Sequence, residues 1–401
     1  MQRIGSRLNM AQAASGMVNG IATPFFGVWL AWRGLSAAQI ALVLSTGLIL
    51  RTVVGPLTGI VADARNDRRE MMLYLYGAVT AGYAAMTAAA SVATVMVAAI
   101  LAQVATGTAL PLLESVSVRL AENHGLHYGR VRLWASSAFV LLNVLGGVLM
   151  WRYGTRTVAP ALVLTSALSI LAAWRLPAIK TPHRVGDFVS GLIETGRETR
   201  ELMRSAPFLL LLAAGSLAQG SHAFYYGYGG LHWHAIGYSG LLIGAIWPLG
   251  VFAEIAILMF SHRIMTVLTP PRLLFWGGTA CLVRWTILSF DPPLAIVIFA
   301  QFLHGFTFAL THLGAMFFIY RAVPARLAAT AQSLYFVCYS GLVMGGATYL
   351  SGIVYTAAGG RAYLLMAAMG AGAMMLAALL AKRWNGGRII ADAGDETIDA
   401  A

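Results

Sequence analysis

The amino-acid sequence predicts an all-α membrane protein with twelve transmembrane helices in two pseudo-symmetric six-helix bundles. Three observations lead to this prediction: the composition, the spacing of apolar runs, and a polar segment near the middle of the chain. Of 401 residues, 59% are hydrophobic and only 10% are charged, whereas soluble domains carry roughly 25% charged residues. A chain of this composition is expected to face lipid over most of its surface.

Apolar runs long enough to cross a bilayer, about 20 residues each, give the predicted helices. We expect these helices at residues 9–31, 37–61, 71–91, 94–120, 130–151, 156–176, 206–232, 239–261, 272–290, 293–320, 328–356 and 362–382.

A polar and basic segment at residues 177–205 divides this series in half. Its arginines recur at helical spacing, which predicts an interfacial linker helix. The two halves also resemble one another, since Ala102-Gln103 matches Ala300-Gln301, as expected of a duplicated unit. We therefore expect a first bundle at residues 1–176, the linker at 177–205, a second bundle at 206–383, and a disordered tail at 384–401.

Basic residues concentrate in alternate loops. The net charge is +12, and if both ends lie on one side, the loops of the other side carry only Arg33, Arg152, Arg156 and Arg361. Cytoplasmic loops are rich in Lys and Arg, so we expect both termini to be cytoplasmic, in a bacterial inner (plasma) membrane. The basic residues are dispersed through these loops, which argues against nucleic-acid binding.

Charged residues within the predicted spans of the first half are candidates for a substrate site, because an isolated charge in lipid is costly. Glu114 lies in the fourth span, and Arg132 opens the fifth after a turn containing Asn123 and Gly125. The two helices can fold back and bring carboxylate and guanidinium together. We expect this pair to contact substrate, with a structural ion pair as the alternative. Arg51, at mid-membrane depth, is a candidate for binding an anion.

The second half carries further ionisable residues inside apolar spans. Such groups respond to local rearrangement and can take part in proton coupling. The alternative is that acid and arginine neutralise each other and that the histidines are hydrogen-bonded packing residues. The candidates for proton coupling are Glu254, Arg284, His304, His222 and His312.

Aromatic side chains accompany these charges. Tyr225 and Tyr228 are three residues apart on one face of the predicted seventh helix, one turn from His222. Together with Phe25 and Trp29 they are candidates for an aromatic-lined pocket, which would suit a small aromatic acid if arginines are also present. A position facing lipid or the membrane interface is the alternative.

The segment between the second and third spans reads Gly59-Ile60-Val61-Ala62-Asp63-Ala64-Arg65-Asn66-Asp67-Arg68-Arg69. It resembles the loop 2–3 signature of the major facilitator superfamily, with Asn66 where the pattern has glycine. An ordinary basic turn is the alternative. The resemblance implies secondary transport by alternating access, in which two bundles rock around a site near the middle of the membrane.

Longer strings resemble the 3-phenylpropionate permease branch of that superfamily, which is related to lactose permease. They are Tyr128-Gly129-Arg130-Val131-Arg132-Leu133-Trp134, Gln219-Gly220-Ser221-His222-Ala223-Phe224-Tyr225-Tyr226-Gly227-Tyr228, Leu249-Gly250-Val251-Phe252-Ala253-Glu254, Val283-Arg284-Trp285 and Gln301-Phe302-Leu303-His304. The resemblance to lactose permease implies that Glu114 and Arg132 grip the substrate and that Phe139 stacks against it. The residues that it assigns to the proton and substrate network are Glu254, Arg284, His304 and Tyr225.

Several positions depart from lactose permease. Thr307 stands where that protein carries its proton-carrying glutamate, and Tyr226, Gly229, Gln301 and Ser340 replace its two interhelical Asp–Lys pairs. Proton transfer is therefore expected to follow another route, and a sugar becomes a less suitable substrate.

We expect a proton-coupled symporter that imports a small organic acid such as an aromatic or phenylpropanoid carboxylate. Two alternatives stay open, a proton-coupled sugar or nucleoside permease and a drug/proton antiporter. The sequence shows no nucleotide-binding loop, metal spacing or nucleophile set, so we expect no enzyme activity, cofactor or metal. The expected partners are the small-molecule substrate, protons and the lipid bilayer, without nucleic acid, and the chain is expected to act as a monomer.

Overall fold

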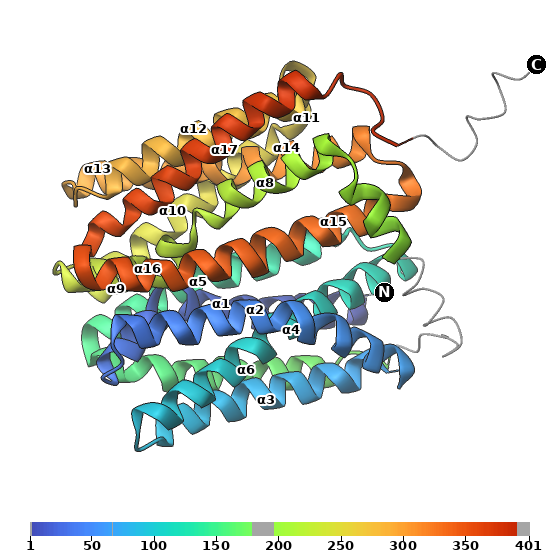
Figure 1. Cartoon of the computed structure of the whole chain (residues 1–401). Coiled ribbons are helices and arrows are strands. Elements are labelled where there is room, and N and C mark those ends of the chain that lie inside the picture. The colour runs from blue at the N-terminus through green and yellow to red at the C-terminus, as the bar shows by residue number, and fades with distance from the viewer. Residues whose placement is uncertain (1, 66, 179–195, 391–401) are drawn as a thin grey trace, which may run out of the picture. The chain divides into compact units, whose positions relative to one another are not determined.

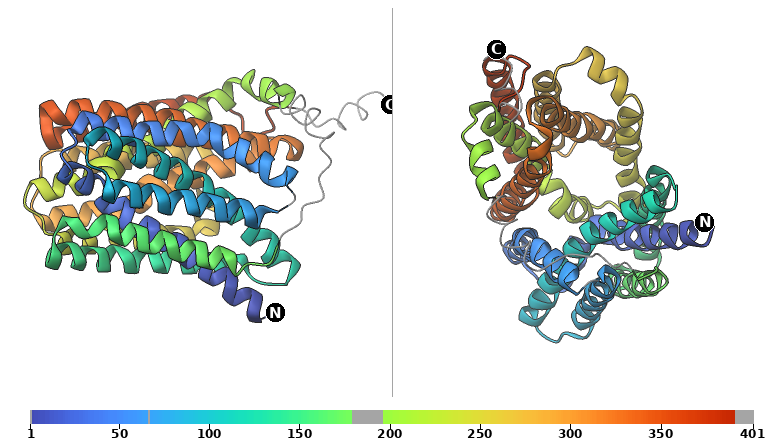
Figure 2. Two further views of the ribbon diagram at one scale, coloured as in Figure 1. Left: turned by 90° about the horizontal axis from the view of Figure 1, so that it is seen from below. Right: turned by 90° about the vertical axis from the view of Figure 1, so that its right-hand side faces the viewer.

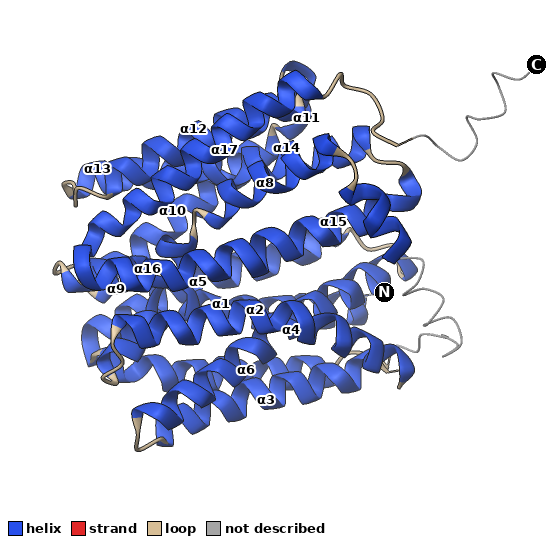
Figure 3. Cartoon of the chain, viewed as in Figure 1, coloured by secondary structure: helices blue, strands red, loops and turns tan. Residues whose placement is uncertain are grey.

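The structure is a computed structural model that describes residues 2–65, 67–178 and 196–390. Helices make up nearly all of these residues, and the described ranges contain no strand (Figure 3). Asn66 of the predicted loop signature, most of the predicted linker, and residues 391–401 of the predicted tail lie outside the described residues.

The helices follow the predicted spans closely (Figure 1). In the first half they are α1 (Gln2–Trp32), α2 (Ala37–Ala64), α3 (Arg68–Ala88), α4 (Val92–Asn123), α5 (Tyr128–Tyr153), η1 (Thr155–Thr157) and α6 (Val158–Trp174). The second half has α8 (Ala206–Gly220), η2 (Tyr225–Gly229), α9 (Gly230–Ala235), α10 (Gly240–Met259), α11 (Ser261–Val267), α12 (Pro270–Leu288), α13 (Leu294–His304), η3 (Gly305–Leu310), α14 (Thr311–Ala322), η4 (Ala325–Leu327), α15 (Ala328–Phe336), η5 (Val337–Val343), α16 (Met344–Ala358), η6 (Gly359–Ala362) and α17 (Tyr363–Arg383). Each of the twelve predicted spans corresponds to one of these helices or to a consecutive series of them.

Many of these helices are apolar enough to cross a membrane. By length and composition, seven helical segments of the described residues meet this condition, or up to eight if the bent pair Gly196–Met203 and Ala206–Ala235 counts as one span. The longest of these segments, Ala325–Arg383, contains two helical series joined at η6. The protein is therefore a multi-pass membrane protein.

Short polar loops define where the helices begin and end. The Asp67 carboxylate accepts hydrogen bonds from the backbone N–H groups of Arg69 and Glu70 at 2.9 and 3.3 Å, which caps the start of α3. Ser91 and Thr94 form a capping box at the start of α4. Gly154 follows α5 with a φ of 83°, a conformation that favours glycine. These caps fix the residues at which the helices begin and end, and therefore where packing against neighbouring helices starts.

Contacts divide the chain into two compact units that are not the two halves of the sequence. Unit 1 comprises residues 1–185, 224–248 and 348–359, and unit 2 comprises the remaining residues. Within unit 1, α1 packs along α5 and α6, and α3 packs along α4 and α6 (Figure 2). Within unit 2, α12 packs along α17 and α14. The expected division into bundles at 1–176 and 206–383 stays a prediction.

Glycine allows a close helix contact in unit 2. A Cβ added at Gly278 of α12 would lie 2.7 Å from the backbone nitrogen of Met374 and 3.0 Å from the carbonyl oxygen of Gly370, both on α17. Small residues at helix contacts let backbones approach in a membrane, where apolar lipid removes the hydrophobic drive for helix association. This contact holds α12, which carries Arg284, against its neighbour.

The beginning of the predicted tail is ordered, which corrects the expectation of disorder from residue 384. The Trp384 ring packs on Phe318 with centroids 4.6 Å apart, and the Ile389 N–H donates to the Ala322 carbonyl at 2.9 Å. Both side chains join an apolar cluster of unit 2 that includes Leu202. Apolar residues in a polar tail can thus attach it to the bundle end, which composition alone did not indicate.

Candidate functional site

The structure brings Glu114 and Arg132 together in unit 1, as the hairpin between α4 and α5 predicts. Nε of Arg132 lies 2.9 Å from Oε1 of Glu114. Oε2 of Glu114 accepts hydrogen bonds from the Tyr128 hydroxyl and, at 3.3 Å, from Nε2 of Gln12 on α1. Three helices therefore hold one carboxylate, and both of its oxygens are engaged.

The Arg132 side chain is only partly enclosed. It is 43% exposed, against 25% for Glu114, and its ion pair with the carboxylate is made through Nε. The Tyr128 side chain is a further hydrogen-bond partner of Arg132. Because a guanidinium carries five N–H donors, the exposed part of this side chain has donors left that can bind a planar anion.

Arg51 packs against the same helix. A Cβ added at Gly107 of α4 would lie 2.5 Å from Cδ of Arg51, so a side chain larger than glycine there would displace the arginine. Gly107 and Glu114 are seven residues apart and therefore share one face of α4, about 10 Å from each other along the helix. The structure thus places Arg51 on the face of α4 that carries Glu114.

A polar crevice lies beside this pair in unit 1. Its lining residues are Ser15, Val18, Asn19, Tyr76, Val79, Thr106 and Leu110. The Tyr76 hydroxyl and Oε1 of Gln12 are buried and have no hydrogen-bond partner among the described residues. Buried polar atoms without partners are uncommon and often contact ordered water.

Unit 2 holds a second charged cluster around Arg284, which is fully buried on α12. Nη1 of Arg284 donates to Nδ1 of His304 at 2.9 Å and to the Thr307 hydroxyl at 3.3 Å, while Nη2 donates to Oε1 of Gln301 at 3.3 Å. The guanidinium also lies 4.4 Å from the centre of the Trp285 ring, a cation–π contact. One arginine thus connects α12 to α13 and η3.

His304 lies between Arg284 and Glu254. Its Nε2 is 3.9 Å from Oε2 of Glu254 on α10, too long for a hydrogen bond. Because arginine can only donate, Nδ1 of His304 must accept, and the neutral ring then carries its hydrogen on Nε2, toward Glu254. This arrangement assigns the tautomer of His304.

His222 joins the cluster through Thr307. Nδ1 of His222 lies 3.0 Å from the Gln219 carbonyl, and its Nε2 lies 3.0 Å from the Thr307 hydroxyl. His312 lies farther along, on α14, where its ring stacks on Phe308 with centroids 6.2 Å apart. Of the three candidate histidines, the structure brings His222 and His304 to Arg284, and His312 is not hydrogen-bonded to that group in the described structure.

The candidate residues Tyr225 and Tyr228 each stack on another aromatic side chain of unit 1. Tyr225 stacks on Trp247 at 4.4 Å, and Tyr228 stacks on Phe224 at 5.6 Å and donates to the Ala37 carbonyl at 2.8 Å. Tyr225, Tyr228, Phe25 and Trp29 are all buried, and Phe139 is half-buried. In this conformation the four buried rings are covered by protein, so their place in a substrate pocket stays a prediction.

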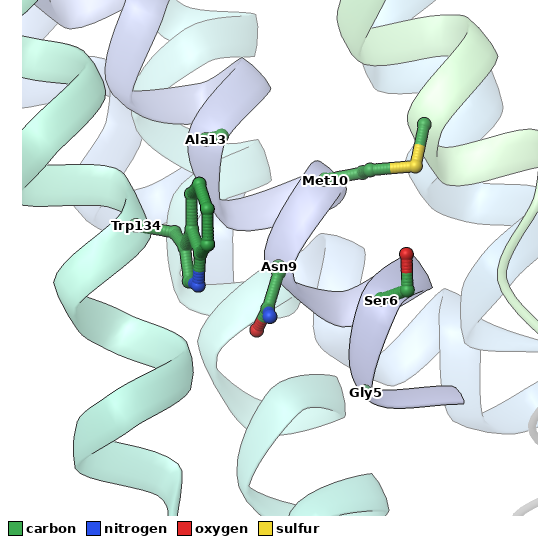
Figure 4. A pocket seen from close by; sticks show the side chains of 6 residues that line it. All are labelled: Gly5, Ser6, Asn9, Met10, Ala13 and Trp134. Carbon is green, nitrogen blue, oxygen red and sulfur yellow. The ribbon is translucent and has the colours of Figure 1, made fainter. Parts of the chain in front are cut away.

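A cavity of about 450 Å³ lies elsewhere in unit 1, between α1 and α5 (Figure 4). Its lining residues are Gly5, Ser6, Asn9, Met10, Ala13 and Trp134. In Figure 4 the Trp134 indole and the Asn9 amide lie close together, and Met10 points away from them. The lining has no charged side chain, so this cavity does not contain the Glu114–Arg132 pair.

The sequence did not indicate several hydrogen-bond partners of the candidate residues. Gln12 lies 102 residues from Glu114 and carries no charge, so nothing in the sequence marks it. Thr307 and Gln301 were noticed only as departures from lactose permease, yet both accept hydrogen bonds from Arg284. Tyr128 belongs to a string that resembles the permease branch, and only its position one turn before Arg132 signals its role.

Comparison with known proteins identifies the family. Residues 17–366 match the model of the MFS_1 like family. The "Probable 3-phenylpropionic acid transporter" of Escherichia coli (strain K12) is 31% identical over 370 residues, covering 89% of this chain and 93% of that protein. The "Maltose permease" of Geobacillus stearothermophilus is 28% identical over 326 residues, covering 80% of each.

Solved structures show the same fold. The nucleoside transporter NupG superposes with a TM-score of 0.80 at 14% identity, covering 94% of this chain and 99% of that chain. A D-xylose-proton symporter superposes with a TM-score of 0.69 at 12% identity, covering 96% and 97%. The architecture is therefore that of major facilitator superfamily transporters, and the chain belongs to the MFS_1 like family of that superfamily.

Proposed function

We propose that the protein is a secondary active transporter that imports a small organic acid, such as an aromatic or phenylpropanoid carboxylate, together with protons by alternating access. The observation that carries this proposal is the Arg132 side chain, which is held through Nε by Glu114 and is 43% exposed. A guanidinium edge matches a carboxylate with two parallel hydrogen bonds. The relative named for 3-phenylpropionic acid supports the same substrate class.

Proton coupling is assigned to the Arg284 cluster of unit 2. Glu254 and His304 are ionisable groups within membrane spans, where such residues commonly mark proton relays. His304 accepts from Arg284 in the described state, so its Nδ1 can take a proton only when the arginine moves away. This link between proton binding and the position of a side chain is what a coupled transporter needs. From the charge of its loops we place both termini on the cytoplasmic side of a bacterial inner membrane, and we propose that the protein acts as a monomer.

A sugar permease is the second candidate function. The maltose permease relative favours it, and a paired carboxylate and guanidinium can also hold neighbouring hydroxyl groups. The two candidate functions differ in the role of Glu114. A sugar needs the Glu114 oxygens as hydrogen-bond acceptors, and an anion does not.

Uptake by purified protein in liposomes tests the proposal. We expect radiolabelled 3-phenylpropionate to accumulate when the outside is acidic, and a protonophore to abolish the accumulation. Unlabelled aromatic carboxylates should compete, and maltose should not. Accumulation of maltose in place of the acid would establish the sugar permease. Uptake that does not depend on the pH gradient would refute proton coupling.

A further inference from the structure

The groups around Glu114 can form hydrogen bonds with either its ionised or its protonated form. Oε2 of this carboxylate accepts from the Tyr128 hydroxyl and from the Gln12 amide. A hydroxyl can donate or accept, and an amide offers a carbonyl oxygen when it turns over. Oε1 of Gln12 is buried and has no hydrogen-bond partner among the described residues, so it is available to accept from a protonated Glu114. A lysine or arginine in place of Tyr128 or Gln12 could donate hydrogen bonds only, and would therefore stabilise only the ionised form of Glu114.

A bound carboxylate would change the charge of this site. Glu114 and Arg132 together are neutral, and an anion on the Nη edge of Arg132 leaves one net negative charge on the three groups. Two carboxylates on opposite edges of one guanidinium are close enough to repel each other in a partly enclosed site. Uptake of one proton restores neutrality without removing either contact partner of the anion.

We propose that Glu114 takes up a proton when the carboxylate of the transported acid binds the Nη edge of Arg132, so that anion and proton bind at one place in unit 1. This inference rests on the proposed function and concerns the proton taken up when the anion binds, whereas the Arg284 cluster is assigned to the transport step that follows. The proton comes from solution and converts the Glu114 carboxylate to a carboxylic acid, and no bond of the solute changes. Release of the anion restores the ion pair and returns the proton.

Apart from Arg132, no charged group of the described residues contacts Glu114 directly. From α5 it meets Arg132 and Tyr128, from α1 Gln12, and from α3 the Tyr76 hydroxyl. Three charged or polar groups lie near it without an ion pair to it: Arg51 beside Gly107 two turns away, Ser117 on its own helix, and Arg68, which donates to Ser115 at 3.1 Å.

The polar crevice offers a route for the proton. Its volume of about 10 Å³ is sufficient for roughly one water molecule. The Tyr76 hydroxyl lines the crevice without a hydrogen-bond partner among the described residues, so a water bound there would find a donor or acceptor. A water in this crevice would bring exchangeable protons toward the Glu114 side of α4.

Calorimetry measures the proposed proton directly. Binding of 3-phenylpropionate to the full-length protein in detergent is titrated in buffers of different ionisation enthalpy at one pH, which gives the number of protons taken up per bound anion. We expect about one proton for the wild type. Glu114→Gln should still bind the anion but take up almost none. Glu70→Gln, which removes a partly exposed carboxylate of α3 that pairs with Arg65, should behave like the wild type.

Infrared difference spectra of the wild type give a second reading that does not depend on a variant's folding. Addition of 3-phenylpropionate should produce the carbonyl band of a new protonated carboxyl, and Glu114→Asp should move this band. Proton uptake that survives in Glu114→Gln but disappears in Glu254→Gln would overturn the inference and place the proton in unit 2. Anion binding without proton uptake by the wild type would overturn it and leave the transport of an organic acid standing. A wild type that binds no carboxylate at any pH would overturn the proposed function itself.

Discussion

Nη1 of Arg284 donates to Nδ1 of His304 across 2.9 Å, and this single contact ties a fixed positive charge to a group that can bind a proton. The imidazole cannot accept a proton on Nδ1 while the guanidinium occupies that lone pair. Protonation of His304 therefore requires Arg284 to move, and movement of Arg284 also breaks its bonds to Thr307 and Gln301.

Arg284→Lys tests whether this geometry matters for transport. A single ammonium cannot reach His304, Thr307 and Gln301 together. Loss of one charge-assisted hydrogen bond costs about 1.5–3 kcal/mol, so we expect gradient-driven uptake of 3-phenylpropionate to fall about tenfold or more. Binding of the anion in detergent should change by less than about threefold, because the proposed anion site is at Arg132.

Arg272→Lys is the matched control for that substitution. Arg272 is exposed at the start of the same helix, α12, and we expect uptake to stay at the wild-type level. Equal losses of uptake in both variants would show that α12 tolerates no lysine, and would remove the evidence for a specific role of Arg284.

The sequence predicted the features that depend on local pattern. Most of the helices were placed within a few residues, because a span must be apolar for about 20 residues and is bounded by polar turns. The exception is α1, which begins at Gln2 and not at residue 9. The Glu114–Arg132 pair followed from a short turn between two such helices. These parts need no knowledge of contacts between distant segments.

The remaining site residues depend on distant contacts or on irregular backbone. Gln12 reaches Glu114 only through the packing of α1 in unit 1. Tyr225 and Tyr228 were expected on one face because they are three residues apart, and both lie in η2, a π-helix, which has a wider turn than an α-helix. Tyr225 stacks on Trp247 and Tyr228 on Phe224. A π-turn has no reliable sequence signature, so the spacing of these residues could not indicate it.

Gly230→Ala should destabilise unit 1. A Cβ added at Gly230 of α9 would lie 1.9 Å from the Pro24 carbonyl oxygen of α1, a distance that no adjustment of a flexible side chain can relieve. The two helices would have to separate, at a cost of about 1–3 kcal/mol. We expect a Tm several degrees lower for the variant in detergent.

Gly77→Ala is the control for the glycine substitution. Gly77 lies within α3, and an added Cβ would meet nothing within 4 Å. Alanine is the better helix former by about 1 kcal/mol, so Tm should stay the same or rise. If Gly230→Ala had the same Tm as Gly77→Ala, the close contact between α1 and α9 would be disproved.

The ion pair between Glu201 and Arg326 should make stability depend on pH. Oxygen atoms of Glu201, in the helix Gly196–Met203, accept from Arg326 at 2.8 and 3.2 Å, and these hydrogen bonds lower the pKa of the Glu201 carboxyl. A carboxyl with a lowered pKa stabilises the folded state above its unfolded pKa of about 4.3, and this contribution is lost as pH falls through the folded pKa.

Glu201→Gln should therefore lower Tm slightly at pH 7 and have little effect at low pH. The Glu201 and Arg326 side chains are 35% and 43% exposed. Solvent and salt therefore screen the pair, and we expect it to contribute about 0.2–1 kcal/mol to the free energy of unfolding. Glu122→Gln, at an exposed position near the end of α4, should leave Tm unchanged at both pH values. A Tm difference for Glu201→Gln that persisted below the folded pKa of Glu201 would contradict the assignment.

Arg132→Lys tests the proposed anion site. Lysine keeps the positive charge but cannot hold Glu114 with one nitrogen and present two more to a carboxylate. Loss of one charge-assisted hydrogen bond in this site should cost about 1.5–3 kcal/mol, or roughly a tenfold to hundredfold weaker affinity for 3-phenylpropionate, measured by calorimetry. Arg130→Lys, at an exposed position two residues earlier on α5, should bind as the wild type does. Wild-type affinity in Arg132→Lys, with normal folding, would make the Glu114–Arg132 pair a structural clamp between α4 and α5, and the anion site would then have to lie elsewhere in the protein.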